Sequence, residues 1–292
     1  MSAADEKTSR RSGRGIVCSD DLPLRAELAD PYGRLPPLRS TEAVLEVRGV
    51  HAVYGDKEVL HNIFCHFPEK RVTAIMGPSG CGKSTLVKIL NRTLELTPGA
   101  KVIAGTVLYH ERDIYDRQSL PMDIRKRIGI IHQRPVPFPM PILDNVLFGA
   151  NFHGLLNGMS PREYAEFYLD KVGLLEEIKD RLGDPASKLS GGQQQRLCLA
   201  RTLANQPEVI LMDEPCSAID PVSTQRIEAL ISELKKEYAI IVVTHNMNQA
   251  RRISDQAVFI FGGRIIEAGD TAQLFKEPKT ELAQSFVSGL IG

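Results

Sequence analysis

The sequence lacks an excess of charge of either sign. Lys plus Arg and Asp plus Glu both number 36 in its 292 residues, so the formal net charge is zero. Nucleic-acid binders that work by bulk charge carry a basic surplus, and so do segments held electrostatically on anionic lipid. The charge balance supports neither class, and we expect no nucleic acid among the partners of this chain.

The sequence also lacks a long apolar run. A helix that spans a bilayer needs roughly 20 consecutive apolar residues, whereas the longest candidates here, 239–244 and 257–261, have the length of a strand. The charged first 15 residues are followed by no apolar stretch, so they do not resemble a secretory signal. We expect a cytoplasmic chain that reaches a membrane only by docking to a partner.

Closely spaced cysteine pairs are missing too. The number of cysteines is odd, their spacings are wide and no CxxC pair occurs. This pattern argues against a zinc site or a disulfide framework. Reduced thiols are therefore expected at Cys18, Cys65, Cys81, Cys198 and Cys216.

The sequence divides into an N-terminal segment of atypical composition, residues 1–42, and one large region predicted to be globular, residues 43–292. Residues 1–42 mix charges of both signs with prolines and show no apolar periodicity, which predicts a disordered or loosely attached extension. The basic cluster at Arg10, Arg11 and Arg14 is interpreted as solvated tail rather than a binding patch. With 42% hydrophobic residues in the whole chain, residues 43–292 can form a single domain with a sizeable core.

Apolar periodicity predicts strands and helices in alternation. Residues 45–48 alternate as a half-buried strand does, and the run 72–76 predicts a buried strand. Leu86, Ile89 and Leu90 follow with the spacing of a helix. The aliphatic runs 209–212 and 240–243 are typical of parallel strands covered on both faces.

Two further segments carry local signals. Ser160, Pro161 and Glu163 predict the capping box of a helix start, with Tyr164, Phe167 and Tyr168 on one face of that helix. Segments 258–261 and 264–267 flank two glycines, which predicts a hairpin.

The strongest chemical signal is a glycine loop between the strand at 72–76 and the helix after it. It fits GxxxxGK[ST], a pattern in which glycines let backbone amides turn towards a phosphate chain and the helix start adds its positive dipole end. Lys83 would contact the β- and γ-phosphates, and the Ser84 hydroxyl would bind Mg²⁺. The alternative is a glycine-rich turn without a ligand. The loop comprises Gly77, Pro78, Ser79, Gly80, Cys81, Gly82, Lys83, Ser84 and the following Thr85.

A second signal is a buried strand that ends in two carboxylates. Asp213 and Glu214 follow the run 209–212, and ligands bind at the carboxyl ends of parallel strands. Asp213 would hold Mg²⁺ through water, and Glu214 would polarise the attacking water as a general base. An ordinary acidic turn after a strand is the alternative interpretation.

The third signal identifies a family. Residues 189–193 read LSGGQ, which resembles the signature of ATP-binding cassette (ABC) ATPases. The resemblance covers 44 to about 290 and implies an α/β fold. Its parts are a P-loop NTPase (RecA-like) core with a parallel sheet, an antiparallel β subdomain and an α-helical subdomain at about 135–190.

The resemblance also implies roles for single residues. Tyr54 is similar to the aromatic residue that stacks on adenine, and Gln133 to the glutamine that contacts Mg²⁺ and reports to the membrane subunit. Asp220 lies in a segment similar to the family's D-loop. His245 is similar to the histidine that touches the γ-phosphate, although a histidine that only caps a strand end is the alternative.

The family's partners follow from the same resemblance. In such proteins the signature of one copy closes over ATP held by the phosphate loop of another, so a head-to-tail dimer is expected. A helix is expected to start here, and its start would supply the anion contacts at Ser190, Gly191, Gly192 and Gln193. Two transmembrane permease subunits and a substrate-binding protein complete the implied complex, with the chain peripheral on the cytoplasmic face of the inner membrane. The region around 133–160 is expected to touch the permease.

The transported solute is indicated by a closer resemblance. The run 135–141, PVPFPMP, together with MDEPCSA at 212–218 and THNM at 244–247, is similar to the ATPase subunit of bacterial phosphate importers. We therefore expect ATP hydrolysis to drive phosphate import. An importer ATPase for another small solute, such as a phosphonate or an amino acid, and a soluble ABC ATPase acting on nucleic acid or ribosomes remain alternatives. The proline run itself is also compatible with a plain stiff surface loop.

Overall fold

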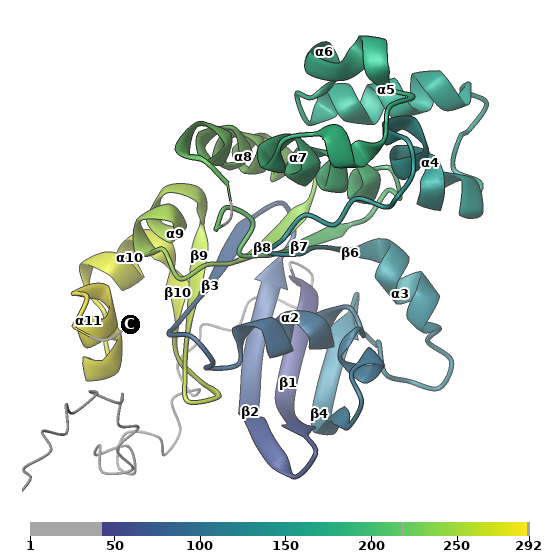
Figure 1. Cartoon of the computed structure of the whole chain (residues 1–292). Helices are drawn as coiled ribbons and strands as arrows, with labels where there is room; N and C mark the ends of the chain where they lie inside the picture. The colour runs from purple at the N-terminus through teal and green to yellow at the C-terminus, as the bar shows by residue number, and fades with distance from the viewer. Residues whose placement is uncertain (1–42, 218, 291–292) are drawn as a thin grey trace, which may run out of the picture. The chain divides into compact units, whose positions relative to one another are not determined.

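The computed structural model describes residues 43–217 and 219–290 (Figure 1). The extension expected at 1–42, with its basic cluster and Cys18, lies outside the described residues. The other four cysteines are free thiols, as expected.

A six-stranded sheet forms the centre of the described chain. Its strands are ordered β10-β9-β3-β8-β7-β6, and all neighbouring pairs are parallel except β9 and β10. The strands are β3 (Val72–Met76), β6 (Ile128–Ile131), β7 (Val209–Asp213), β8 (Ala239–Val243), β9 (Gln256–Phe261) and β10 (Arg264–Asp270). Every residue of β3 and β8 is buried, which confirms the prediction from their largely apolar runs, because both faces of a parallel sheet are covered.

The expected hairpin closes one edge of this sheet. Phe261 pairs with Arg264 across a turn in which Gly262 and Gly263 have φ of 54° and 73°. Positive φ at both central residues matches the right-handed twist of the flanking strands and favours glycine.

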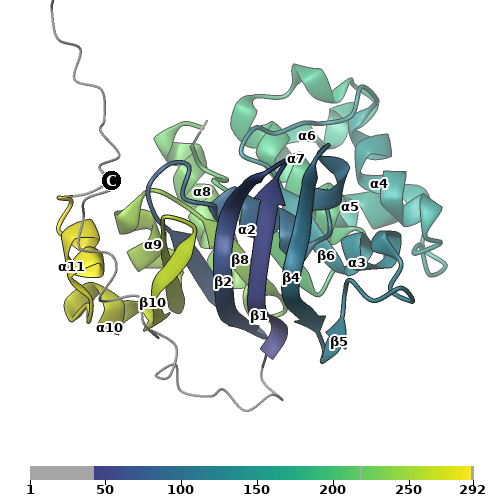
Figure 2. The ribbon, with the colours of Figure 1, turned by 90° about the horizontal axis from the view of Figure 1, so that it is seen from below.

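A second, antiparallel sheet faces the viewer in Figure 2. Its order is β2-β1-β4-β5. The strands are β1 (Ala43–Tyr54), β2 (Lys57–Pro68), β4 (Ala100–Tyr109) and β5 (Arg112–Asp113). Leu45 and Val47 are buried, whereas Arg48 is exposed, so the alternation seen in the sequence marks the two faces of this sheet.

Helices complete the fold, and α4, α5 and α6 gather beyond one end of the central sheet (Figure 1). The helices are α2 (Lys83–Leu90), α3 (Pro121–Arg127), α4 (Ile142–Phe152), α5 (Pro161–Lys171), α6 (Leu175–Ile178), α7 (Gly191–Leu203), α8 (Pro221–Leu234), α9 (Met247–Ile253), α10 (Thr271–Lys276) and α11 (Glu281–Val287), with short 3₁₀ turns at Leu94–Leu96, Lys179–Arg181 and Ala186–Lys188. The predicted α/β fold is confirmed, with a parallel core, an antiparallel sheet and a group of helices.

One hydrophobic cluster joins the helices to the sheet. Leu197 and Leu203 of α7 pack in the same buried cluster as Ile210 and Met212 of β7 and Val146 of α4. Helix α7 is therefore shared by the helical group and the core, and a shift of the helical group acts on α7 directly.

Helix α5 begins with the predicted capping box. The Ser160 hydroxyl accepts from the Glu163 amide, and the Glu163 carboxylate accepts from the Ser160 amide. The three predicted residues lie on one side of the helix, since the Tyr168 ring centre is 5.0 Å from that of Tyr164 and 5.1 Å from that of Phe167, but Phe167 is 54% exposed and only the two tyrosines are buried. The buried stripe instead takes Leu169, because each residue turns the helix by about 100° and 167 falls outside the arc.

Among the residues with described structure, no helix is long and apolar enough to cross a membrane.

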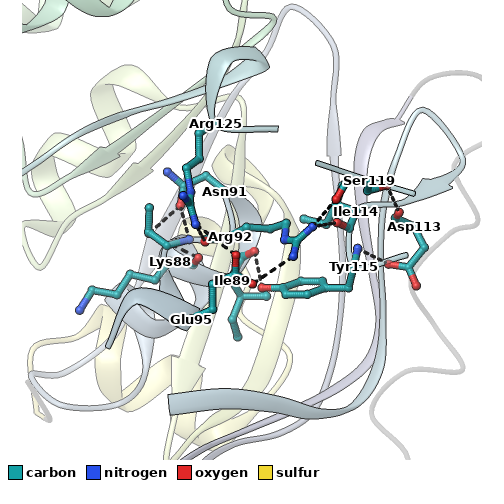
Figure 3. A network of polar contacts seen from close by, with 11 residues as sticks. Lys88, Ile89, Asn91, Arg92, Glu95, Asp113, Ile114, Tyr115, Ser119 and Arg125 are labelled. Carbon is teal, nitrogen blue, oxygen red and sulfur yellow. Dashed lines mark hydrogen bonds and ion pairs between the residues drawn. The ribbon is translucent and has the colours of Figure 1, made fainter. Parts of the chain in front are cut away.

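A polar network fastens the far end of α2 to the antiparallel sheet (Figure 3). Arg92, just past α2, donates to the carbonyl oxygens of Ile114 at 2.9 Å and Ser119 at 2.7 Å and pairs with Glu95 at 3.1 Å. Its guanidinium lies 5.1 Å from the centre of the Tyr115 ring, a cation–π contact. Arg92 also has φ of 58°, a conformation that ordinary residues adopt only where the surroundings hold them.

The same network continues to α3. Arg125 of α3 donates to the Arg92 carbonyl at 2.6 Å and to Glu95 at 3.1 Å. Helix α3 leads directly into β6, and β6 leads to Gln133. Arg92 therefore joins the helix that follows the glycine loop to the segment that carries Gln133.

We expect Arg92→Ala to lower the free energy of unfolding by about 2–4 kcal/mol, because two backbone carbonyls, Glu95 and a ring lose a charged partner. Urea unfolding followed by circular dichroism measures the change. The exposed Arg117, in the same connection, is the matched control, and its change to Ala should stay within about 0.5 kcal/mol. Equal losses in the two variants would contradict the role of the network.

Candidate active site

A cavity of about 450 Å³ opens at the carboxyl ends of β3 and β7. Its lining draws on segments far apart in the sequence: the glycine loop, the start of α2, Gln133, and the residues that follow β7 and β8. The lining residues are Val59, Ser79, Gly80, Gly82, Lys83, Ser84, Thr85, Gln133, Glu214 and His245. All of these lining residues except Val59 were indicated by the sequence.

The start of α2 presents backbone amides to this cavity. No side chain caps the helix at Gly82, so the first-turn amides that lack helical partners keep their hydrogens for a ligand. Gly80 and Gly82 have φ of 78° and 107°, values that let the loop wrap inwards. Uncapped amides and the positive end of a helix dipole form an anion site.

Gly77 occupies a position that no other residue could fill without a shift of the backbone. A Cβ at Gly77 would lie 2.1 Å from the Ile260 carbonyl oxygen and 2.8 Å from the Cys81 sulfur. The glycine loop therefore turns directly against β9, and Cys81 is a buried packing contact beneath it.

Lys83 bridges the loop from inside. Its Nζ donates to the carbonyl oxygens of Gly77 and Pro78, each at 2.8 Å, and only 6% of the residue is exposed. The ammonium is thus held at the cavity by two neutral acceptors, and a charged oxygen ligand could replace them with a stronger partner.

Ser84, which lines the cavity, is hydrogen-bonded to Asp213 at the end of β7. The Ser84 hydroxyl donates to Asp213 Oδ1 at 3.1 Å. Burial raises the pKa of the Asp213 carboxyl above its ordinary value, the Ser84 hydrogen bond opposes that shift, and the charge of Glu214 adds to it. A cation beside these oxygens would relieve the cost of the buried carboxylate.

Glu214 stands in a strained backbone conformation at the end of β7. Its φ is 50°, a value that costs of order 1–3 kcal/mol for a residue other than glycine. The Glu214 amide donates to the Val243 carbonyl at 3.0 Å. Its carboxylate lies 3.1 Å from Gln133 Nε2 and 3.1 Å from His245 Nδ1. Residues that follow the carboxyl ends of β6, β7 and β8 therefore meet at one carboxylate.

The chemistry available here is that of hydrolysis at an anionic substrate. The cavity offers backbone amides, one ammonium and hydroxyl groups to an anion, and it holds a carboxylate that accepts a hydrogen bond from Gln133 and lies beside the His245 ring. The donors suited to a metal ion, Ser84, Asp213 and Gln133, are all oxygen ligands of the kind that Mg²⁺ takes. No cluster of three or more His, Cys, Asp or Glu in the described part of the chain could hold an ion alone, so phosphate and water oxygens would complete its shell.

The sequence profile of the ABC transporter family matches residues 60–217, more than half of the chain. This chain belongs to the ABC transporter family. As an ABC ATPase, it binds and hydrolyses ATP. ATPases of this family function as dimers with membrane permease subunits.

Curated relatives match over nearly the whole chain. The chain is 46% identical over 256 residues to the phosphate import ATP-binding protein PstB of Oceanobacillus iheyensis. The aligned residues cover 88% of this chain and 92% of that protein. It is 45% identical over 268 residues to the protein of the same name from Shewanella denitrificans, with 92% and 98% covered.

Solved structures confirm the fold. The cbiO1 protein from Clostridium perfringens, described as part of the ABC transporter complex cbiONQ, matches with a TM-score of 0.69 at 30% identity and covers 81% of this chain and 92% of that chain. A bacterial Atm1-family ABC exporter with ATP bound matches with a TM-score of 0.72 at 24% identity, covering 89% of this chain and 44% of that chain. The second likeness concerns the fold alone.

The ABC signature begins a helix, as the sequence indicated. Ser190 is the N-cap of α7, and its hydroxyl accepts from the Gln193 amide while Gln193 accepts from the Ser190 amide. Asp220 caps α8 by accepting from the amides of Val222 and Ser223. A serine hydroxyl that accepts from its own helix keeps its proton to donate outwards.

The signature residues and Asp220 do not line the cavity of their own chain. Ser190, Gly191, Gly192, Gln193 and Asp220 are absent from its lining. The lining also leaves out Tyr54, at the end of β1, together with Gly77, Pro78, Cys81 and Asp213. Asp213 is hydrogen-bonded to Ser84, which lines the cavity. Tyr54 does not line it, although Val59 of β2, the strand paired with β1, does.

Two residues near the proline run escaped the sequence analysis. Asn145 is fully buried in α4; its oxygen accepts from the Phe138 amide at 2.8 Å, and its nitrogen donates to three carbonyls of residues 138–141. Arg201 of α7 stacks 4.0 Å from the centre of the Phe138 ring and donates to the Val136 carbonyl. The run is therefore anchored by side chains as well as stiffened by prolines. The Val136 partner of Arg201 lies 65 positions away, so no local signal could have found that pair, whereas the contacts of Asn145 span only four to seven positions.

Proposed function

We propose that this chain hydrolyses ATP to drive the import of inorganic phosphate through a membrane complex. The observation that carries the proposal is the 45–46% identity to two phosphate import ATP-binding proteins over about nine tenths of the chain. The proline run after Gln133 adds a segment that resembles the ATPase subunit of phosphate importers. The cavity supplies the ATPase chemistry that such a motor needs.

The cavity residues take the following parts in this proposal. The loop 77–85 and Lys83 bind the phosphate chain of ATP, and Tyr54 stacks on adenine. Ser84, Asp213 and Gln133 would hold Mg²⁺, which would neutralise charge on the phosphate oxygens. Glu214 takes a proton from the attacking water, whose oxygen forms a bond to the γ-phosphorus while the bond between that phosphorus and the bridging oxygen breaks, so that ADP and phosphate result.

The contacts of Glu214 support this assignment. Gln133 and His245 approach the same carboxylate from beyond the ends of β6 and β8, the two strands that flank β7, so its orientation is fixed before a ligand arrives. A preorganised base needs no rearrangement during the reaction. His245 is proposed to contact the γ-phosphate, because its ring remains 58% exposed at the cavity.

We further propose the assembly in which this motor works. Two copies join head to tail, so that Ser190 to Gln193 and Asp220 of one copy complete the cavity of the other. Their absence from the cavity of their own chain supports this arrangement. Two permease subunits hold the pair at the cytoplasmic face of the membrane, and a substrate-binding protein delivers the solute from outside.

The solute is tested by stimulation of the ATPase in the assembled complex. The substrate-binding protein is added with inorganic phosphate, with a phosphonate or with an amino acid, and ATP turnover is measured in vesicles. We expect phosphate alone to raise turnover. Stimulation by a phosphonate or an amino acid with no response to phosphate would assign a different solute and leave the ATPase chemistry untouched.

Replacing Pro137, Pro139 and Pro141 together with alanine should uncouple hydrolysis from transport. The run follows Gln133 directly, and a stiff segment transmits displacement where a flexible one absorbs it. The isolated subunit should keep its ATPase activity, whereas the assembled complex should lose phosphate uptake and the response of its ATPase to phosphate. Uptake in reconstituted vesicles is the measurement.

The other outcomes of this experiment assign the run differently. Normal uptake by the triple variant would make the run a plain surface loop. Loss of ATPase in the isolated subunit would mean that the run supports the active site directly, and the docking surface would then lie elsewhere.

A further inference from the structure

One carboxylate on α6 collects hydrogen bonds from three directions. Glu177 accepts from Arg196 through both guanidinium nitrogens at 3.0 Å, from Gln193 Nε2 at 3.0 Å and from Arg226 at 2.7 Å. Arg196 and Gln193 belong to α7, and Arg226 belongs to α8. The neighbouring Glu176, by contrast, is 79% exposed and pairs with Lys179 alone.

The position of Arg196 makes this cluster more than a surface ion pair. Its side chain is 5% exposed, and it also donates to the Gly173 carbonyl at 2.5 Å. A buried guanidinium must be fully paired, because an uncompensated charge is costly there. The hydrogen bonds from Arg196 lower the pKa of Glu177 to about 2, so the cluster stays charged at any working pH.

Glu177 contacts the signature segment and the helix that begins at Asp220, and neither Gln193 nor Asp220 lines the cavity of its own chain. Gln193 closes the capping box on Ser190 while its amide nitrogen donates to Glu177. Arg226 lies on α8, whose first turn is capped by Asp220. The two helix starts also touch, since a Cβ on Gly192 would lie 2.3 Å from the Ser223 hydroxyl. A single carboxylate therefore links the start of α7 with α8.

We propose that Glu177 is a positioning residue that fixes the signature loop against the start of α8, so that both meet the nucleotide of a second copy together. The inference rests on the head-to-tail dimer of the proposed function. Glu177 touches neither the nucleotide nor the reacting atoms; it acts through Gln193 and Arg226. Its loss should weaken dimer formation and leave nucleotide binding by the loop 77–85 of the same chain intact.

The test uses Glu177→Gln in a Glu214→Gln background, where unhydrolysed ATP should keep dimers together. We expect the protein concentration at half dimerisation with ATP to rise about tenfold or more, because a charged acceptor of several hydrogen bonds becomes neutral. Analytical ultracentrifugation measures dimerisation, and a fluorescent ATP analogue measures monomer affinity, which should change less than about twofold. Glu176→Gln is the matched control and should leave both unchanged.

The outcomes separate this inference from the proposal beneath it. If the Glu214→Gln parent dimerises with ATP and Glu177→Gln dimerises equally well, the inference is overturned and the dimer stands. If the Glu214→Gln parent stays monomeric with ATP, the head-to-tail dimer is contradicted, and the inference about Glu177, which rests on that dimer, is overturned as well. A purely structural Glu177 would lower the melting temperature without moving the dimerisation midpoint. If Glu177→Gln fails to fold, the exposed Arg226→Gln replaces it and should weaken dimerisation by a smaller factor; no change would overturn the inference.

Discussion

Glu214→Gln should abolish most ATP turnover while ATP still binds. The amide keeps the size of the side chain and an acceptor for Gln133 and His245, but it cannot take a proton from water. General-base catalysis contributes roughly 10²- to 10⁴-fold, and the rate should fall by about that factor. Because glutamine tolerates the local backbone as glutamate does, the loss should come without a loss of stability.

The measurement is steady-state ATPase activity of the isolated subunit beside ATP binding. Glu208→Gln is a suitable control, since Glu208 immediately precedes β7 at its opposite end and pairs with His110 and Arg127 away from the cavity. Size-exclusion chromatography should show a stable dimer of Glu214→Gln with ATP. Turnover within threefold of the unmodified chain would remove Glu214 from the role of base.

Lys83→Ala should weaken ATP binding by roughly 10- to 100-fold, since a hydrogen bond to a charged group contributes about 1.5–3 kcal/mol. Lys83 supplies the cavity's only buried ammonium among the residues that line it, and it also holds the carbonyls of Gly77 and Pro78. Its removal therefore eliminates both the positive charge at the cavity and the two hydrogen bonds that hold the loop.

Calorimetry with ATP measures this change directly. Lys88→Ala keeps the same helix and removes a lysine that does not line the cavity, so its affinity should match that of the unmodified chain. Near-normal affinity of Lys83→Ala would count against the assignment of the loop to phosphate binding.

The parts of the site that sequence reasoning found are those with local signals. The glycine loop needs positive φ and close packing at fixed offsets, and the runs before Gly77 and Asp213 bury their side chains without a break. Parallel strands then bring their carboxyl ends to one edge. The convergence of Gln133, Glu214 and His245 follows from that topology, although their sequence positions are more than 30 residues apart.

The parts that escaped prediction depend on long-range partners. Arg201 and Asn145 are 56 positions apart, and Arg226 and Glu177 are 49 apart. A buried arginine in a helix looks the same in sequence as an exposed one, and only the tertiary structure decides which carboxylate meets it. The exposure of Phe167 could not be predicted for a related reason, since a pattern of apolar residues indicates a stripe on a helix but not its exact edges.

The most direct test of the account is phosphate uptake by the reconstituted complex. Vesicles carrying the two permease subunits and this chain receive ATP on the side of the chain and labelled phosphate with the substrate-binding protein on the other. We predict uptake that requires ATP and disappears with Glu214→Gln. Uptake that continues with the Glu214→Gln chain, or ATP hydrolysis by the assembled complex with no movement of phosphate, would contradict the proposal.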